Sequence, residues 1–213
     1  MTARNQATEM LRTSWSRCWT GLAARGDGHD VFEKLIESYR EPQRKYHTLQ
    51  HLAECLALFD RYQHLAIHPH EVEIALWFHD AIYEVRAGDN EARSADWARA
   101  SLRDAGVANE ACERVHEHVL ATRHAALPIG QDQALLVDID LSILGAPEAR
   151  FDEYEAQVRA EYGWVPDFLF KRKRREILAE FLARAVLYST PALRDALESA
   201  ARKNLSRSLA GLH

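Results

Sequence analysis

The chain has 213 residues, which is enough for one large domain or two small ones with a buried core. Its 47% hydrophobic and 28% charged residues are typical of a globular protein, and the net charge of −5 argues against a surface that coats nucleic acid. The three cysteines lie far apart without a CxxC pair, so a zinc ribbon and a disulfide framework are excluded and reduced core thiols are expected. No stretch approaches about 18 apolar residues, and we expect a cytoplasmic protein without a membrane partner.

Hydrophobic residues recur with a period near 3.6 along most of the chain, and proline and glycine separate the periodic segments. No alternating or β-branched run indicates a sheet. We therefore predict an all-α fold, a single-domain helical bundle over residues 1–213. The expected helices cover residues 5–24, 30–40, 47–65, 70–85, 91–105, 109–125, 131–145, 148–162, 167–188 and 191–209.

The adjacent pair His79 and Asp80 is the most informative feature of the sequence. It lies within the apolar segment 71–84, in the helix expected over 70–85. A titratable pair on a helix face that points to the core costs several kcal/mol unless it is hydrogen-bonded or bound to a metal ion. The pair therefore predicts partners elsewhere in the chain.

Two histidines upstream are the first candidate partners. His47 and His51 are four residues apart and share one face if the segment is helical. His51 leads an apolar stripe through Cys55, so we expect it to point inward, with His47 nearer the mouth of a site. A pair at this spacing also arises by coincidence or as a capping arrangement.

Downstream, two aspartates follow an apolar run. Asp140 has apolar residues at all four helical neighbour positions, and a carboxylate in such surroundings needs a cation or strong donors. Asp138 has a weaker apolar frame. We prefer Asp140 as the inward ligand and place Asp138 outside the ligand set or facing outward. The alternative is that Asp140 only pairs with an arginine such as Arg123.

Together these residues form a mixed nitrogen and oxygen ligand set from three helices. Such a set suits a divalent ion, Mn, Fe, Co, Ni, Zn or Mg, and the ligand types do not choose among them. The basic run 171–175 has two interpretations. It is either a solvated helix face, or one or two of its arginines contact a phosphate.

The order of these motifs resembles the HD-domain superfamily of metal-dependent phosphohydrolases. The segments YHTLQH, WFHDAIY, DNEARSA, DIDLSILGAP, FLAR and ARKNL are more narrowly similar to a small bacterial branch of predicted HD phosphohydrolases. The resemblance covers residues 39 to 209. It implies an HD-type bundle with one divalent metal ion held by His51, His79, Asp80 and Asp140. A second metal ion would draw on His116, His118 or His124, and one ion is our default expectation.

The activity that the resemblance implies is hydrolysis of a phosphate ester or anhydride by metal-bound hydroxide, on a nucleotide-like small molecule. Asp80 would also orient the attacking water, and His47 or Glu91 would handle protons. Phosphate charge and substrate contacts are assigned to a further set of side chains: Arg44, Arg123, His124, Arg174 and Arg175.

Other functions remain open on the sequence. A helical module that senses a nucleotide or a metal ion without turnover would keep the same pocket. A di-iron oxygenase of HD type would need a full dinuclear ligand set. Nucleic-acid binding through residues 171–175 is disfavoured by the overall acidity. The sequence does not name the substrate, and a homodimer is left open.

Overall fold

The computed structural model describes residues 3–212 of the chain. All secondary-structure elements of the described part are helices, and it contains no strand, which confirms the all-α prediction. The chain divides into two compact units, residues 1–137 and 138–213, and the single-domain expectation stays a prediction. The first unit holds α1 (Ala3–Gly21), α2 (His29–Ser38), α3 (Leu49–Tyr62), η1 (Gln63–Leu65), α4 (Pro69–Phe78), α5 (Asn90–Asp104), α6 (Asn109–Ala121) and most of α7 (Gly130–Asp140). The second holds η2 (Leu141–Gly145), α8 (Glu148–Glu161), α9 (Asp167–Ala183) and α10 (Pro191–Gly211).

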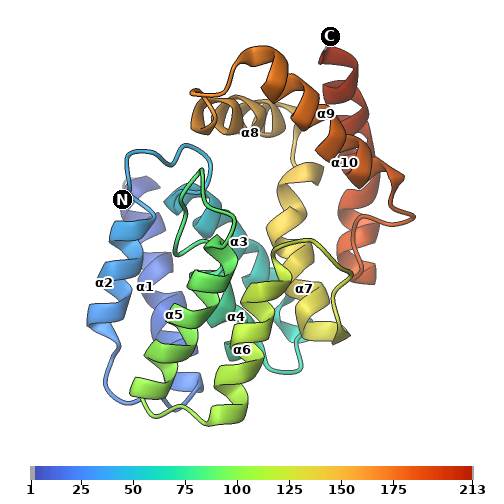
Figure 1. The fold of residues 1–213 in the computed structure, drawn as a ribbon. Coiled ribbons are helices and arrows are strands. Elements are labelled where there is room, and N and C mark those ends of the chain that lie inside the picture. Colours follow the sequence, from blue (N-terminus) through green and yellow to red (C-terminus); the bar gives the residue numbers. More distant parts are fainter. Residues whose placement is uncertain (1–2, 213) are drawn as a thin grey trace. The chain divides into compact units, whose positions relative to one another are not determined.

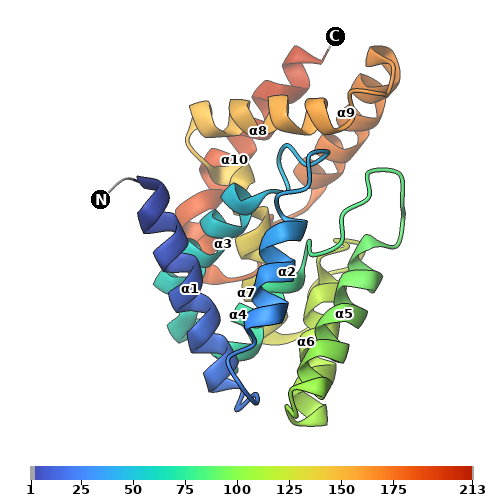
Figure 2. The same ribbon diagram turned by 90° about the vertical axis from the view of Figure 1, so that its left-hand side faces the viewer.

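Helix α4 is the central element of the first unit (Figures 1 and 2). It packs against α1, α3, α5 and α6, and every residue from Glu71 to Phe78 is buried. A helix that is buried on all sides must be apolar nearly all round, and the segment 72–78 is apolar at every position but Glu73. Helix α4 therefore fixes the place of whatever follows Phe78.

Two glutamates of α4 are buried and paired with arginines from neighbouring helices. Arg17 of α1 donates to Glu73 at 2.6–3.2 Å, and Ser14 adds a hydrogen bond of 2.7 Å to the same carboxylate. Arg114 of α6 binds Glu71 through two bonds of 2.7 Å. A buried carboxylate without such partners would be strongly destabilising. These pairs join α1 and α6 to α4.

Helix α4 is shorter than the sequence predicted. The helix expected over 70–85 ends at Phe78, so His79 and Asp80 lie in the turn after it and not inside a helix. The last carbonyls of a helix lack partners within it. Here Arg44 donates to the carbonyl oxygens of Asp80 and Ala81, at 2.6 and 3.0 Å, which satisfies backbone that a longer helix would have paired internally.

Several further helix ends differ from the expectation: α1 ends at Gly21 and not at 24, and α7 ends at Asp140 and not at 145. Helix α6 ends at Ala121 and not at 125, and short-range backbone bonds close the turn 122–124. Helix α9 ends at Ala183 and not at 188. Glu198 of α10 accepts from the backbone N–H groups of Leu187 and Tyr188, which holds the segment after α9 in a non-helical path. At the end of α9 a tertiary contact therefore overrides the periodic pattern, whereas the end of α6 is set by local backbone bonds.

The second unit is built around η2, against which α8 and α10 pack. Asn204 of α10 donates to the carbonyl oxygens of Leu144 and Ala146, both at 2.9 Å. The Tyr188 hydroxyl donates to the carbonyl of Leu141 at 3.1 Å. These buried bonds fix η2 against α10 and against the segment that precedes it.

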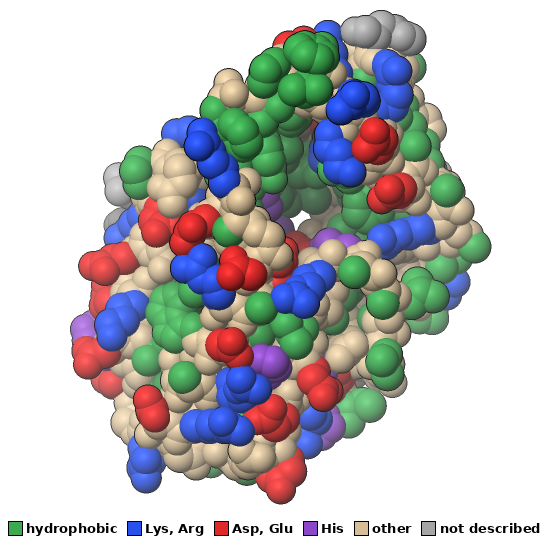
Figure 3. Space-filling model, in the orientation of Figure 1, with side chains coloured by type: hydrophobic (Ala, Val, Ile, Leu, Met, Phe, Trp, Pro, Cys, Tyr) green, Lys and Arg blue, Asp and Glu red, His purple; other side chains and the backbone are tan. Residues whose placement is uncertain are grey.

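The surface of the first unit carries both signs of charge. On the face shown in Figure 3, Lys and Arg side chains are interspersed with Asp and Glu. Arg99 binds Asp96 at 2.6 Å, and Arg103 binds Glu113 at 2.5 Å. In the part of the chain described, no helix has the length and apolar character needed to cross a membrane. All three cysteines are free and buried, as expected for core thiols.

The buried histidine of α6 predicts a pH-dependent stability. His118 is 6% exposed, and neither of its ring nitrogens has a hydrogen-bond partner among the described residues. Burial lowers the pKa of His118, although Asp132 and Glu71 act in the opposite direction. The unfolded chain therefore binds the proton more readily, and the folded state loses stability as the pH falls below about 6.5.

We expect His118→Leu to reduce this acid sensitivity. Urea denaturation at about pH 7.5 and about pH 5.5 measures it as the difference in the free energy of unfolding. The loss on acidification should be smaller in His118→Leu than in the wild type, whereas a control at the exposed His64, His64→Gln, should behave like the wild type. Equal losses in all three proteins would contradict this role.

Candidate metal centre

His51 lies in the first turn of α3 and points into the core of the first unit, where it is 2% exposed. Helix α3 begins at Leu49 because the Thr48 side chain accepts from the Gln50 backbone N–H at 3.3 Å. The predicted inward direction of His51 is confirmed. His47 precedes the helix, so the two histidines do not share a helical face as the spacing suggested.

His79 caps the end of α4 and is 1% exposed. Its Nδ1 lies 2.7 Å from the carbonyl oxygen of Leu76. A carbonyl oxygen only accepts, so Nδ1 carries the hydrogen, and in the neutral ring Nε2 presents a lone pair. This is the tautomer in which histidine binds a metal ion through Nε2.

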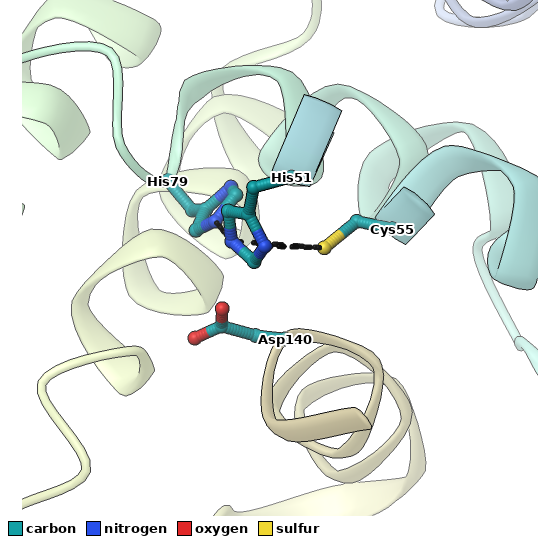
Figure 4. Close-up of side chains that lie close together, drawn as sticks. All are labelled: His51, Cys55, His79 and Asp140. Carbon is teal, nitrogen blue, oxygen red and sulfur yellow. Dashed lines mark hydrogen bonds between the residues drawn. The ribbon is translucent and has the colours of Figure 1, made fainter. Parts of the chain in front are cut away.

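Three donor atoms converge in the first unit. The Nε2 atoms of His51 and His79, whose rings are drawn in Figure 4, are 3.0 Å apart. Oδ2 of Asp80 lies 3.1 Å from the His79 nitrogen and 3.6 Å from the His51 nitrogen. Ligands at about 2.1 Å from a metal ion stand about 3.0 Å apart at right angles and about 3.4 Å apart at tetrahedral angles. The three separations therefore fit one divalent ion.

The Tyr46 hydroxyl fixes the ring of His51. It lies 3.0 Å from Nδ1 of His51, and the two rings are 4.7 Å apart. Without a cation, the hydroxyl donates to Nδ1 and His51 Nε2–H donates to His79. With a cation at Nε2, the direction reverses and Nδ1–H donates to the hydroxyl oxygen. Both arrangements satisfy the groups, so Tyr46 holds the ring in place in either state.

Asp80 is held in its ionised form. Burial acts to raise the pKa of its carboxyl, but the positive charge that the neighbouring imidazoles carry when protonated, His79 foremost and then His47, outweighs burial and holds that pKa well below its ordinary range. An ionised carboxylate beside two imidazole nitrogens is a donor set suited to a divalent cation.

Cys55 is a neighbour of the site that we did not predict as a ligand. It lies one turn after His51 on α3, and its Sγ is 3.7 and 3.8 Å from the two ring nitrogens of His51 (Figure 4). One donor atom each of His51, Cys55 and His79 lies within 4.8 Å of the other two. The i, i+4 spacing from His51 was the signal that could have identified it.

The two aspartates of α7 lie in the second unit. Asp140 is the last residue of the helix and is half-buried, and its assignment as the fourth ligand stays a prediction. Asp138 is 1% exposed, so of its two expected placements the outward one is wrong, and the placement outside the ligand set stays a prediction. Its carboxylate accepts from the backbone N–H groups of Ser189 at 2.9 Å and Thr190 at 2.5 Å, directly before α10. Burial raises the pKa of Asp138, and these N–H groups lower it in part.

His47 lies beside the site. Its ring stacks on Tyr83 with 4.1 Å between the ring centroids, and it meets the Tyr46 ring edge-on at 4.8 Å. His47 is half-buried, which agrees with the expected position nearer to solvent than His51. Its role in proton transfer stays a prediction.

Glu91 and Arg123 face each other, with 4.0 Å between Oε2 and Nε. His124 follows Arg123 with a positive φ of 54°, in the turn that ends α6. Their assignments to proton transfer and substrate contact stay predictions. Of the candidates for a second metal ion, His116 pairs with Asp96 at 3.0 Å.

The arginines predicted to bind phosphate lie in different surroundings. Arg44 is buried, and its guanidinium is engaged by backbone carbonyls and by Glu41. Arg174 is also buried. It pairs with Glu155 and lies over the Tyr154 ring at 5.0 Å, within the second unit. Arg175 is exposed, as expected for a solvated helix face.

Comparisons with known proteins do not identify the chain. No family model, no curated protein and no solved structure matches it. The conclusions about the site therefore depend on its own geometry, and the resemblance to HD domains stays an expectation of the sequence.

We expect alanine substitution of His51, His79 or Asp80 to remove a bound divalent ion. Loss of a direct ligand should cost more than the roughly 10- to 100-fold in affinity that a neighbour of a ligand costs. Titration calorimetry with Mn²⁺, Co²⁺ and Zn²⁺ measures the affinity, and His64→Ala serves as an exposed histidine control. Wild-type metal content in His79→Ala would contradict the assignment.

Asp138 should contribute to stability rather than to metal binding. Asp138→Ala leaves two backbone N–H groups before α10 without an acceptor, which should lower the free energy of unfolding by about 2–4 kcal/mol. Urea denaturation measures this change, and the exposed Asp195→Ala should alter it by less than about 0.5 kcal/mol. If Asp138→Ala instead weakens metal binding and leaves stability unchanged, the assignment is wrong.

Proposed function

We propose that this protein is a cytoplasmic, metal-dependent phosphohydrolase of HD-domain type that acts on a phosphate ester or anhydride of a nucleotide-like small molecule. The observation that supports the proposal is the convergence of His51 Nε2, His79 Nε2 and the ionised Asp80 carboxylate at separations of 3.0–3.6 Å. The preference for phosphate comes from the sequence resemblance, because the donor set itself specifies only a divalent ion.

The three donors leave coordination positions for other groups. A six-coordinate ion held by three protein atoms retains positions for a water molecule, for a substrate oxygen and for Asp140, the predicted fourth ligand, whereas a four-coordinate ion retains one position. A divalent ion in such a site polarises a phosphoryl oxygen and makes bound water more acidic.

The side chains around the donors suggest a division of roles. The Asp80 carboxylate has a second oxygen beyond the one near the imidazoles, and this oxygen can orient a water molecule. His47 is half-buried and acts electrostatically on Asp80, which suits proton transfer at its imidazole. Arg123, whose side chain is 44% exposed, is the nearest to solvent of the cations expected from the first unit to neutralise phosphate charge.

The proposal is tested by a panel of nucleotides and phosphomonoesters, assayed with added Mn²⁺, Co²⁺, Ni²⁺ or Mg²⁺. We expect metal-dependent release of phosphate or pyrophosphate from at least one of them. His79→Ala should abolish this activity because it removes a metal ligand, and His64→Ala should retain it.

Two results would contradict a hydrolase. One is metal binding by the wild type without turnover of any compound in the panel. The other is a ligand-dependent rise in melting temperature without cleavage, which would favour a module that senses a nucleotide. If His79→Ala keeps the activity, the hydrolysis does not take place at this metal centre.

A further inference from the structure

Arg44, in the connection between α2 and α3, is a buried cation whose acidic partner lies near the surface. Its side chain is 0% exposed, whereas that partner, Glu41, is 43% exposed and lies 3.0 Å from Nε. A buried guanidinium is costly unless its N–H groups are satisfied. The role of Arg44 therefore depends on the other groups that its N–H donors contact.

Those partners are backbone carbonyls of two separate segments. Nη1 of Arg44 donates to the carbonyl oxygen of His47 at 3.2 Å and to that of Asp80 at 2.6 Å. Nη2 donates to the carbonyl oxygen of Ala81 at 3.0 Å. One segment leads into α3 and His51, and the other is the turn that contains His79 and Asp80.

Aromatic rings complete the surroundings of the guanidinium. It lies 5.2 Å from the centroid of the Tyr39 ring and 5.6 Å from that of the Tyr83 ring. Tyr83 in turn stacks on His47 at 4.1 Å. Both the hydrogen bonds and the rings thus join the segment before α3 to the turn after α4. A planar guanidinium can make these directed contacts, and an ammonium group cannot reproduce them.

The same contacts account for the shape of the turn. Helix α4 ends at Phe78 although the sequence pattern continues to Glu84. Carbonyl groups near a helix C-terminus lack internal partners and carry partial negative charge. The guanidinium binds the carbonyls of Asp80 and Ala81, in the turn just after the helix, and so stabilises the chain direction that brings Asp80 beside His79.

We propose that Arg44 is a positioning residue of the metal centre: its guanidinium joins the segment before α3 to the turn after α4 and so sets the spacing of His51, His79 and Asp80. This inference rests on the metal centre of the proposed function. It replaces the phosphate contact that the sequence suggested for Arg44, because the carbonyls and Glu41 already engage the guanidinium.

The test compares Arg44→Lys and Arg44→Gln with the wild type in the full-length protein. Both variants should bind Co²⁺ about 10- to 100-fold more weakly, as expected when a residue that orients ligands is lost. The visible absorption spectrum of the Co²⁺-loaded protein should change as well, because the ligand geometry changes. In an active preparation, kcat should fall while KM stays within about twofold, since Arg44 does not touch the substrate.

The matched control is Arg17→Lys. Arg17 also pairs with a buried group of α4, Glu73, and with Asp60 near the end of α3, but it contacts neither the segment before α3 nor the turn after α4. It should lose stability and keep the wild-type Co²⁺ affinity and spectrum. Melting temperatures and near-ultraviolet circular dichroism identify a temperature at which all variants are folded, and the Co²⁺ measurements are made at that temperature. If only Arg44→Lys fails to fold, Arg44→Gln, which buries no charge, provides the comparison.

The outcomes separate this inference from the proposed function. Wild-type Co²⁺ affinity and spectrum in a folded Arg44 variant, or equal losses in Arg44→Lys and Arg17→Lys, would overturn the positioning role. If kcat/KM falls only because KM rises, Arg44 contacts the substrate, and this result would also overturn the positioning role. If the wild type binds Co²⁺ but hydrolyses nothing, the phosphohydrolase proposal fails while the affinity and spectrum still decide the role of Arg44. If the wild type binds no divalent ion, both fail.

Discussion

The close approach of two imidazole nitrogens beside an ionised carboxylate is the constraint on which the site depends. His51 and His79 are almost fully buried, and their Nε2 atoms are 3.0 Å apart. Two lone pairs at that distance repel each other unless a proton or a cation lies between them. Their outer nitrogens are already engaged, by Tyr46 and by the Leu76 carbonyl, so the rings cannot turn away without losing those bonds.

Helix α4 connects this constraint to the rest of the first unit. Its burial on all sides leaves no solvent for Glu71 and Glu73, and arginines from α6 and α1 neutralise them. These ion pairs and the packing on all sides hold α4 in a single position between its neighbours. Because His79 and Asp80 directly follow it, the position of α4 also determines where the two donors lie.

Arginine has several structural roles in this protein. Arg44 binds backbone carbonyls, Arg114 and Arg17 neutralise buried glutamates, and Arg174 binds Glu155 and lies over an aromatic ring. A planar group with five N–H donors can satisfy several acceptors in a dry environment. The sequence shows the positive charge but not the acceptors, and this is why Arg44 and Arg174 were expected to bind phosphate.

The sequence by itself determined the helical class and the approximate place of every helix, since period 3.6 patterning and the positions of proline and glycine are local properties. It also identified His51, His79 and Asp80, because buried titratable groups in apolar segments need partners wherever the chain takes them. Only the tertiary structure decided where α4 and α9 end, and that the Asp138 carboxylate accepts from the backbone N–H groups of Ser189 and Thr190 before α10. Each of these depends on an atom from a distant segment, such as the Arg44 guanidinium or the Glu198 carboxylate, whose approach no local pattern encodes.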